Sequence, residues 1–430
     1  MRSIRISPVI KIGAVAAAAA MGLAACSSGG SGTNANGSVK LTWWNNATAD
    51  PLKTVFKQLA DQYHAAHPKA TIAITPIQNE QFTTKIPVAL RGNNPPNLYQ
   101  QWGGGNLATQ IQSGKVMDLT SATSSWIGEI GKAAAGWQAN GRQYGIPYDL
   151  HAVGFWYRKD LFARAGITSP PATMNELTAD VAKLKAAHIV PIAIGSKDKW
   201  PDAFYWDYFA VRECSQSVLQ HDIKAIKLSD PCFTKAGQDL KSFMAIHPFQ
   251  PGFLSTPAQQ GAGSSAGMLA NGKAAMELQG DWDPSVFASL ASNKNYATHL
   301  GWFSFPALSG AAGSQQALLG GGDGFSCTVG SPPACVDFLK FLASPSSQKK
   351  LVSNNAGLPV NPAATSAFTS PTLQKVFQTY QTAPFVQTYF DIALPTNVGQ
   401  ALDDAVANFF AGKGTPQSIV QQTNQAAATQ

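Results

Sequence analysis

The chain has little charge, because only 13% of its 430 residues are Asp, Glu, Lys or Arg. No long basic run occurs, and no basic stripe interleaved with aromatic residues is present, which nucleic-acid binding would require. Three of the 31 basic residues, Arg2, Arg5 and Lys11, precede the first hydrophobic run; without them, 28 basic residues stand against 24 acidic ones. We therefore expect no nucleic-acid partner. Low charge together with ten tryptophans suits a neutral, polar ligand better than an ionic one.

Several enzyme motifs are also missing. The sequence contains no Walker loop and no HExxH motif, and its cysteines and histidines lack zinc spacing, so we expect neither a metal nor a cofactor. His64 and His67 are predicted to be solvated residues in the last turn of a helix. Residues 263–267 match the GxSxG nucleophile elbow in form, but a loop precedes them where the elbow requires a strand. Paired carboxylates of a glycosidase form in space rather than in sequence, so that alternative stays open.

No hydrophobic run is long enough to span a bilayer comfortably. The run Ile12–Ala20 is short and follows three basic residues, which predicts a secretory signal over residues 1–25. It ends in Leu-Ala-Ala-Cys, which resembles the bacterial lipoprotein cleavage box. Cys26 is then the lipidated residue, and we expect the protein to be anchored at the extracellular face of the cell membrane; an uncleaved membrane anchor is the alternative. The small, polar residues 26–38 predict a flexible tether.

Cysteine is scarce after Cys26, with only four further residues: Cys214, Cys232, Cys327 and Cys335. An even count in an exported chain points to disulfides. Of the three possible pairings, proximity favours Cys214 with Cys232 and Cys327 with Cys335.

Strand and helix patterns alternate from residue 39 onward. Val39–Trp44 alternates as a strand does, a helix follows Asp50 and Pro51 and stops at Pro68, and residues 71–75 alternate again. This βαβ opening predicts an α/β fold with a parallel sheet and a ligand site at the carboxyl ends of its strands. The remaining chain of about 390 residues is longer than one hydrophobic core ordinarily supports, which predicts two lobes.

Six short segments, in their order along the chain, resemble family 1 extracellular solute-binding proteins of ABC sugar importers. They are Gln78–Phe82, Gln101–Gly104, Tyr144–Tyr148, Phe155–Phe162, Asn271–Trp282 and Gly357–Asn361. The stretches 78–80 and 101–105 further resemble the actinobacterial xylobiose-binding branch. The chain departs from the family pattern at Pro87, which is expected to interrupt a helix, and at Asn97 and residues 174–175.

The resemblance implies a two-lobed, periplasmic-binding-protein-like fold of type II with hinge crossings and a central cleft. Lobe one would comprise residues 39–148 plus 322–365, and lobe two residues 149–321 plus 366–430, with hinges near 148–151 and 319–324. It implies a monomeric binding protein, not an enzyme, whose partners are an oligosaccharide and the permease subunits of an ABC importer. A secreted glycosidase and a surface lipoprotein without a transport role are the alternatives.

A sugar has apolar C–H faces and a rim of hydroxyls, so its site needs flat aromatic rings and polar groups around them. The ring candidates are Trp43, Trp44, Trp102, Tyr148, Trp200 and Trp282, whereas Trp206 is predicted to pack in the core. The candidates for the hydroxyl rim and the hinge are Asn45, Glu80, Gln81, Gln101, Asp149, Gln279, Asp281 and Gly321. The alternative roles are helix capping for Glu80 and a backbone-bonded hinge position for Asp149.

Overall fold

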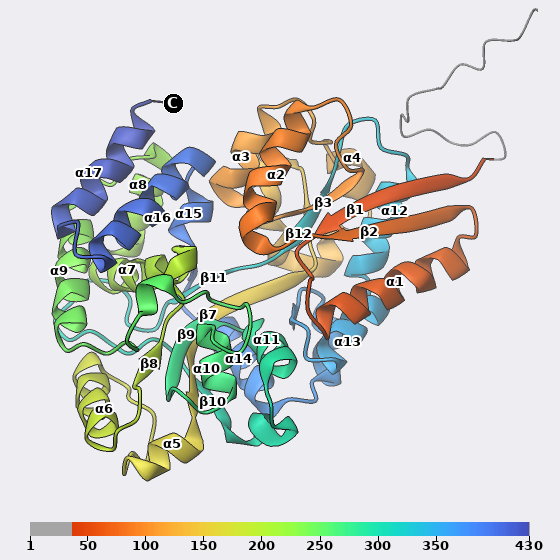
Figure 1. Ribbon diagram of the computed structural model, residues 1–430. Helices are drawn as coiled ribbons and strands as arrows, with labels where there is room; N and C mark the ends of the chain where they lie inside the picture. The colour runs from red at the N-terminus through yellow and green to blue at the C-terminus, as the bar shows by residue number, and fades with distance from the viewer. Residues whose placement is uncertain (1–36, 430) are drawn as a thin grey trace, which may run out of the picture.

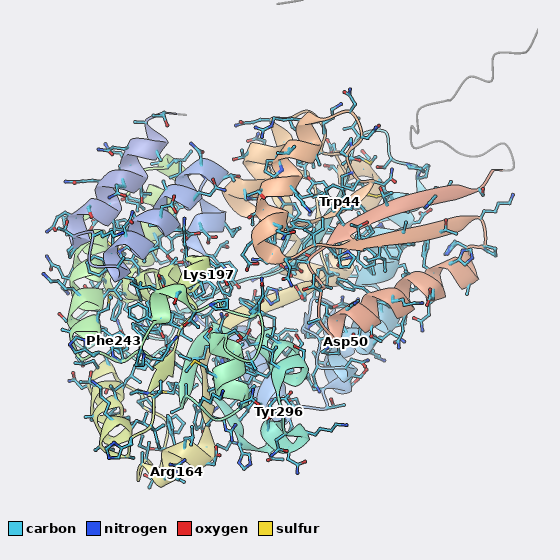
Figure 2. The ribbon with its side chains drawn as sticks, viewed as in Figure 1. Trp44, Asp50, Arg164, Lys197, Phe243 and Tyr296 are labelled. Atoms are coloured by element: carbon cyan, nitrogen blue, oxygen red, sulfur yellow. A yellow bond between two sulfur atoms is a disulfide. The ribbon has the colours of Figure 1, made fainter. Side chains whose placement is uncertain are left out.

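The computed structural model describes residues 37–429. The predicted signal segment, the lipidation site Cys26 and the tether up to residue 36 lie outside the described residues. Within residues 37–429, every helix is too short or too polar to cross a membrane. The described chain forms two α/β lobes, each built on its own sheet (Figure 1), and Figure 2 shows their side chains in the same view.

The first lobe surrounds a five-stranded sheet with the order β2-β1-β3-β12-β6. Its strands are β1 (Val39–Asn45), β2 (Ala70–Pro76), β3 (Leu98–Gln101), β6 (Ile146–Pro147) and β12 (Gly324–Cys327). The predicted βαβ opening is confirmed, because β1 pairs in parallel with β2 across the helix α1 (Leu52–Ala66). The other elements of this lobe are α2 (Asn79–Arg91), α3 (Gly104–Ile111), α4 (Thr120–Thr123), η1 (Ile127–Trp137), β4 (Gln138–Ala139), β5 (Arg142–Gln143), α12 (Ala334–Ala343), α13 (Pro345–Ser353) and η5 (Pro362–Ala367).

The second lobe surrounds a sheet whose long central strand is β7 (Asp149–Arg158). The sheet order is β14-β11-β7-β9-β8, with β10 and β13 also paired to β7. The remaining strands are β8 (Ile192–Ala193), β9 (Met276–Gly280), β10 (Leu300–Phe303), β11 (Leu318–Gly321), β13 (Leu358–Pro359) and β14 (Val386–Thr388). The helices are α5 (Lys159–Arg164), α6 (Met174–Ala186), η2 (Ser196–Asp198), α7 (Trp200–Glu213), α8 (Gln216–Ala225), α9 (Pro231–Ala245), η3 (Phe253–Ser255), α10 (Ser265–Ala270), α11 (Asp283–Leu290), η4 (Lys294–His299), α14 (Pro371–Thr382), α15 (Phe390–Ala393), α16 (Thr396–Phe410) and α17 (Pro416–Ala427).

Helix α7 is the centre of the second lobe, because residues 201–213 are all buried. Trp206 packs between Phe233 and Phe390, at centroid distances of 6.1 and 5.5 Å. The prediction that this tryptophan belongs to the core is therefore confirmed. The guanidinium of Arg212 donates to the backbone carbonyls of Phe305 and Ala317 at 2.9 Å each, which ties α7 to the segment that leads into β11.

Two of the places where the chain crosses between the sheets are adjacent. It leaves the first sheet after β6, passes Tyr148 and enters β7; it returns from β11 to β12 through Gly322 and Asp323. Glycine is needed at positions 320 and 322 because the backbone of the other crossing lies very close. An added Cβ would strike the carbonyl oxygen of His151 at position 320 and that of Asp149 at position 322. The two crossings therefore lie directly against one another.

Both predicted disulfides are confirmed in the described chain. Cys214, at the end of α7, is bonded to Cys232 in the first turn of α9. Cys327, at the end of β12, is bonded to Cys335 in α12. The first bond encloses α8, with a sequence separation of 18, and the second joins β12 to α12, with a separation of 8.

The prediction that Pro87 interrupts its helix is wrong, because α2 runs unbroken through this residue to Arg91. Ile86 and Leu90, on either side of Pro87, are buried together with Phe82 and Tyr99. This packing holds the helix although proline removes one backbone donor.

The structure agrees with the interpretation of residues 263–267 and with that of the two histidines at the end of the first helix. Residues 256–264 form a loop before α10, so Ser265 does not sit on a strand-to-helix elbow. His64 lies in the last turn of α1 and His67 caps it, and both are exposed.

Candidate ligand-binding cleft

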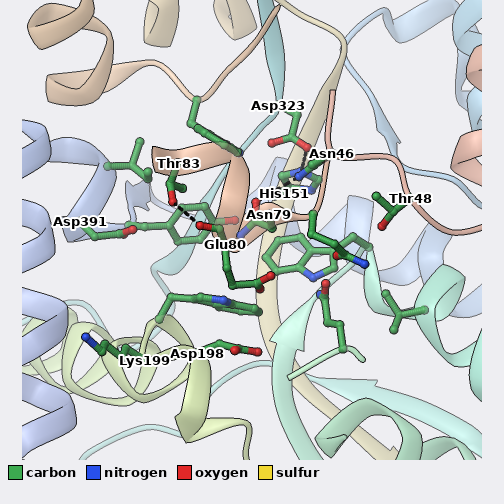
Figure 3. A pocket seen from close by; sticks show the side chains of 18 of the residues that line it. Asn46, Thr48, Asn79, Glu80, Thr83, His151, Asp198, Lys199, Asp323 and Asp391 are labelled. Carbon is green, nitrogen blue, oxygen red and sulfur yellow. Dashed lines mark hydrogen bonds and ion pairs between the residues drawn. The ribbon is translucent and has the colours of Figure 1, made fainter. Parts of the chain in front are cut away.

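A cavity of about 560 Å³ lies between the two lobes (Figure 3). The first lobe lines it with residues 46–49 after β1, with residues 78–80 at the start of α2, and with Trp102 after β3. The second lobe contributes residues 198–200 and 204 around the start of α7, residues 282, 285 and 286 at the start of α11, and the α15–α16 segment. The carboxyl ends of β1 and β3 therefore face the cavity, as expected for an α/β sheet.

Aromatic rings form much of the cavity wall. Trp102 stands on the first lobe, edge-on to Phe82 at 5.5 Å between centroids. Trp200 and Trp282 stand on the second lobe, 6.4 Å apart, and neither is fully buried. Phe204 and Tyr389 extend this wall and pack together at 5.3 Å. Flat rings from both lobes thus face the same space.

The floor of the cavity is a buried cluster of charged groups where the chain crosses between lobes. The Nε2 atom of His151 lies 3.3 Å from Asp149 Oδ1 and 3.5 Å from Asp323 Oδ2, and its Nδ1 lies 3.1 Å from Asp281 Oδ1. Burial alone would lower the pKa of His151, but these three carboxylates raise it well above its ordinary value. The three aspartates therefore favour the imidazolium form of His151.

The same cluster also binds the backbone of both crossings. Asp149 Oδ1 accepts the N–H of Asp323 at 2.8 Å, and Asp281 Oδ1 accepts the N–H of Ala152 at 2.9 Å. Tyr148 donates its hydroxyl to Asp323 Oδ2 at 3.1 Å. Burial raises the pKa of Asp149 well above its ordinary value, although the charge of His151 opposes this rise.

Asp149, His151 and Asp323 are also a set whose ligand atoms, within 4.8 Å of one another, could converge on a metal ion. No metal is expected from the sequence. The ion pairs of His151 with the carboxylates account for the arrangement of these three side chains, so we assign no metal to it.

Polar contacts join the two lobes at both sides of the cavity. Gln260 Nε2 donates to Glu80 Oε2 at 3.2 Å, and Asn106 Nδ2 donates to Thr396 Oγ1 at 3.2 Å. Gly104 and Gly105 approach the backbone of residues 392–394 so closely that an added Cβ would collide with it. Helix α3 therefore rests directly on the α15–α16 segment.

The structure brings five of the predicted ligand-binding residues to the cavity. They are Glu80, Trp102, Asp149, Trp200 and Trp282. Glu80 lies in the first turn of α2, and Asp149 accepts a backbone N–H at the crossing, so the alternative roles suggested for these two residues are present as well.

Trp43 does not line the cavity, and its placement corrects the prediction that it faces the ligand. It is fully buried against Phe56, Phe325 and Phe338. The physical reason is strand alternation, since Trp43 shares one face of β1 with the core residue Leu41. Trp44, on the opposite face, packs with the Phe82 cluster beside Trp102.

Six other predicted polar or hinge residues do not line the cavity, and most of them lie behind the residues that do. Asn45 accepts the N–H of Ala47 at 3.0 Å and shapes the turn after β1. Gln101 accepts the N–H of Gly103 and donates to Gln110, beneath Trp102. The remaining positions are Gln81, exposed on α2; Gln279, buried in β9; Asp281, bonded to His151; and Gly321, packed on Tyr389.

Tyr148 is likewise a core residue rather than a cavity residue. Its ring stacks on Phe325 at 4.7 Å, and only its hydroxyl reaches the charged floor, through Asp323.

Several further residues line the cavity. Asn46 lies at the carboxyl end of the first strand, where a ligand site was expected, whereas His151, Tyr389 and Asp391 were missed. Asn46 donates to Asn79 at 3.2 Å, which joins the end of β1 to the start of α2. His151 follows Asp149 by two residues, and the period of a strand would have placed both on one face. Tyr389 and Asp391 come from the C-terminal part of the chain, where no local pattern indicated a site.

Comparison with known proteins identifies the family. Residues 48–349 match the sequence pattern of the bacterial extracellular solute-binding proteins. The chain belongs to this family. The family is defined by solute binding, which agrees with the expectation of a binding protein rather than an enzyme.

One relative of this chain is an uncharacterized ABC transporter extracellular-binding protein of Pyrococcus horikoshii, which is 25% identical over 266 residues. That match covers 59% of this chain and 57% of the relative, so the chain spans little more than half the length of this relative. The diacetylchitobiose binding protein DasA of Streptomyces coelicolor is 23% identical over 283 residues, covering 64% of this chain and 63% of DasA.

Solved structures match over a larger part of the chain. A protein studied for xylan utilization in the thermophilic bacterium Caldanaerobius polysaccharolyticus has a TM-score of 0.82 and 27% identity, covering 90% of this chain and 99% of that one. A chitin oligosaccharide binding protein has a TM-score of 0.79 and 22% identity, covering 91% and 98%. The predicted two-lobed α/β fold is confirmed by these similarities.

Proposed function

We propose that this protein is the extracellular substrate-binding component of an ABC importer and binds a short oligosaccharide in the cleft. The observation that carries the proposal is the aromatic wall, with Trp102 on one lobe and Trp200 and Trp282 on the other. Such rings can cover the apolar faces of a sugar, while Asn46, Asn79 and the carboxylates around them bind hydroxyls. The cavity volume of about 560 Å³ suits a small ligand.

The best candidate sugar is xylobiose or another short β-1,4-linked oligosaccharide. The similarity to a protein studied for xylan utilization supports this choice. Chitin-derived sugars are also candidates, because this chain is similar to the diacetylchitobiose binding protein DasA and to a chitin oligosaccharide binding protein.

Binding is proposed to close the lobes about the crossings at residues 148–151 and 319–324. Lobe one would be residues 39–148 with 322–365, and lobe two residues 149–321 with 366–430, although β13, within 322–365, pairs with β7 of the second sheet. We further propose a lipid anchor at Cys26, a monomeric state, and delivery of the sugar to membrane permease subunits.

A thermal-shift screen of the chain without its signal segment tests the proposal. The panel contains β-1,4-linked and α-linked di- to tetrasaccharides, including xylobiose, cellobiose, diacetylchitobiose and maltose. A ligand at one hundred times its Kd stabilises the native state by about 2.7 kcal/mol, which raises Tm by several degrees. We expect a β-1,4-linked disaccharide to give the largest shift.

Two outcomes would contradict the proposal. If no sugar of the panel shifts Tm, the cleft does not bind these ligands and a surface scaffold becomes the better account. If chromatography of the same mixtures after overnight incubation shows cleaved sugars, the protein is a glycosidase.

A further inference from the structure

The cleft is far more acidic than the chain around it. Over its full length the chain has a formal charge of +7, with 31 basic and 24 acidic residues. Among the described residues that line the cavity, Lys199 is the one lysine or arginine. The acidic lining residues are Glu80, Asp149, Asp198, Asp323, Asp391, Asp403 and Asp404. A concentration of carboxyl groups in a basic protein is a local feature of this site. Burial raises the pKa of Asp149 and of Asp403 well above the ordinary value, which favours their neutral forms.

Part of this negative charge is neutralised within the protein. Lys199 Nζ lies 2.5 Å from Asp404, and it extends away from Asp198 in Figure 3. His151 neutralises part of the charge of the aspartates at the floor. No lysine or arginine of residues 37–429 forms an ion pair with the four carboxylates that remain, those of Glu80, Asp198, Asp391 and Asp403.

Glu80 and Asp198 come from opposite lobes and face the same cavity (Figure 3). Glu80 starts α2 and accepts from Gln260, whereas Asp198 precedes α7 and accepts the N–H of Ala258 at 2.8 Å. Burial raises the pKa of both carboxyls, and the charge of Asp198 raises that of Glu80 further. These two groups therefore repel one another. Neither forms an ion pair with a lysine or arginine of residues 37–429, although the charge of Lys197 partly opposes the rise in the pKa of Asp198.

We propose that Glu80 and Asp198 form a binding site for an ammonium group of the ligand, so that, among the short β-1,4-linked oligosaccharides proposed above, this protein prefers amino sugars to neutral ones such as cellobiose and xylobiose. The inference rests on the proposed function, because it assigns a substrate class to the same cleft. An ammonium group donates charge-assisted hydrogen bonds to carboxylates, and the nearby Trp200 and Trp102 can add cation–π attraction. A ligand with a carboxylate, such as a uronic-acid sugar, is excluded by like-charge repulsion.

The low charge of the whole sequence favours a neutral ligand. The structure changes this expectation, because folding gathers seven of the 24 acidic residues around one cavity.

Titration calorimetry with four β-1,4-linked disaccharides at pH 6.5 and low salt tests the inference. The glucosamine disaccharide carries ammonium groups; diacetylchitobiose has the same skeleton with these groups acetylated; cellobiose is neutral; and cellobiouronic acid is anionic. We expect the glucosamine disaccharide to bind at least about tenfold more tightly than cellobiose, because one charge-assisted contact in a partly buried site is worth about that factor. The ratio should fall when the salt concentration is raised to 0.5 M.

Two variants identify the residues responsible. Glu80→Gln and Asp198→Asn should each lower the affinity ratio of the glucosamine disaccharide to cellobiose by at least about threefold. The matched control Asp61→Asn removes one exposed carboxylate of α1 outside the cleft, and it should leave the ratio unchanged.

Cellobiose or diacetylchitobiose binding as tightly as the glucosamine disaccharide would overturn the inference while leaving the proposed function intact. Tight binding of cellobiouronic acid would overturn it in the same way. If none of the four disaccharides binds, and the wider sugar panel also gives no shift, the proposed function fails and the inference fails with it.

Discussion

Replacing Trp282 with alanine removes a ring that faces the cleft from the start of α11. The ring is partly exposed to the cavity and touches His151 edge-on at 4.8 Å. An aromatic side chain buries about 200 Å², so one face offers about 100 Å² to a sugar. At about 25 cal/mol per Å², the loss of this face costs about 2.5 kcal/mol of binding free energy. We therefore expect Trp282→Ala to weaken sugar binding about seventyfold.

Titration calorimetry and thermal melting, performed on the same preparation without sugar in the melt, measure this effect. Trp206→Ala is the matched control, because this tryptophan is fully buried in the core of the same lobe. Its loss should cost about 3 to 5 kcal/mol of stability and leave the folded fraction able to bind. Trp282→Phe retains an aromatic face and should lose less affinity than the alanine variant. The reasoning is refuted if Trp282→Ala binds the sugar as tightly as the unmodified protein.

Three further predictions concern motion, disulfides and pH. Small-angle scattering should show a smaller radius of gyration at saturating sugar, because the lobes rotate about the crossings; an unchanged radius would contradict induced closure. Replacing Cys214 and Cys232 together by serine should lower the free energy of unfolding in denaturant by about 3 kcal/mol, because this bond closes a loop of 18-residue separation; no loss would contradict it. Burial raises the pKa of Asp202 to about 8, partly opposed by the hydroxyl of Ser196. Since the unfolded chain releases this proton near pH 3.9, Asp202 should reduce stability by about 1.4 kcal/mol per pH unit between about pH 4 and 8, and Asp202→Asn should lack this slope in melts across that range. An identical slope in both proteins would contradict the assignment.

The sequence was sufficient to predict the architecture because the relevant signals are local. The alternation of β1, the apolar spacing of α1 and the parallel return in β2 follow from residues close together in the chain. Disulfide pairing also followed from proximity. Pro87 was misjudged because the packing that holds its helix comes from Tyr99 on a separate strand.

The site was predicted only in part, because a cleft between lobes gathers residues from distant segments. Trp102 and Trp282 were identified from glycine-containing loops after strands, whereas Trp43 was misplaced although its alternation with Leu41 indicated the core. Tyr389 and Asp391 reach the cavity from a segment more than 100 residues from Trp282, and no spacing rule connects these positions. The acidity of the cleft could not be predicted from a basic composition, because it depends on which carboxylates share one cavity.

A crystal structure of the protein with the most stabilising disaccharide of the panel would show directly whether the cleft binds a sugar against its tryptophans. We expect one sugar ring in the cavity between the lobes, with an apolar face against Trp282 and polar substituents within hydrogen-bond distance of Glu80 or Asp198. A sugar bound outside this cavity, or bound inside it without contact to Trp102, Trp200 or Trp282, would show that the proposed binding site is wrong.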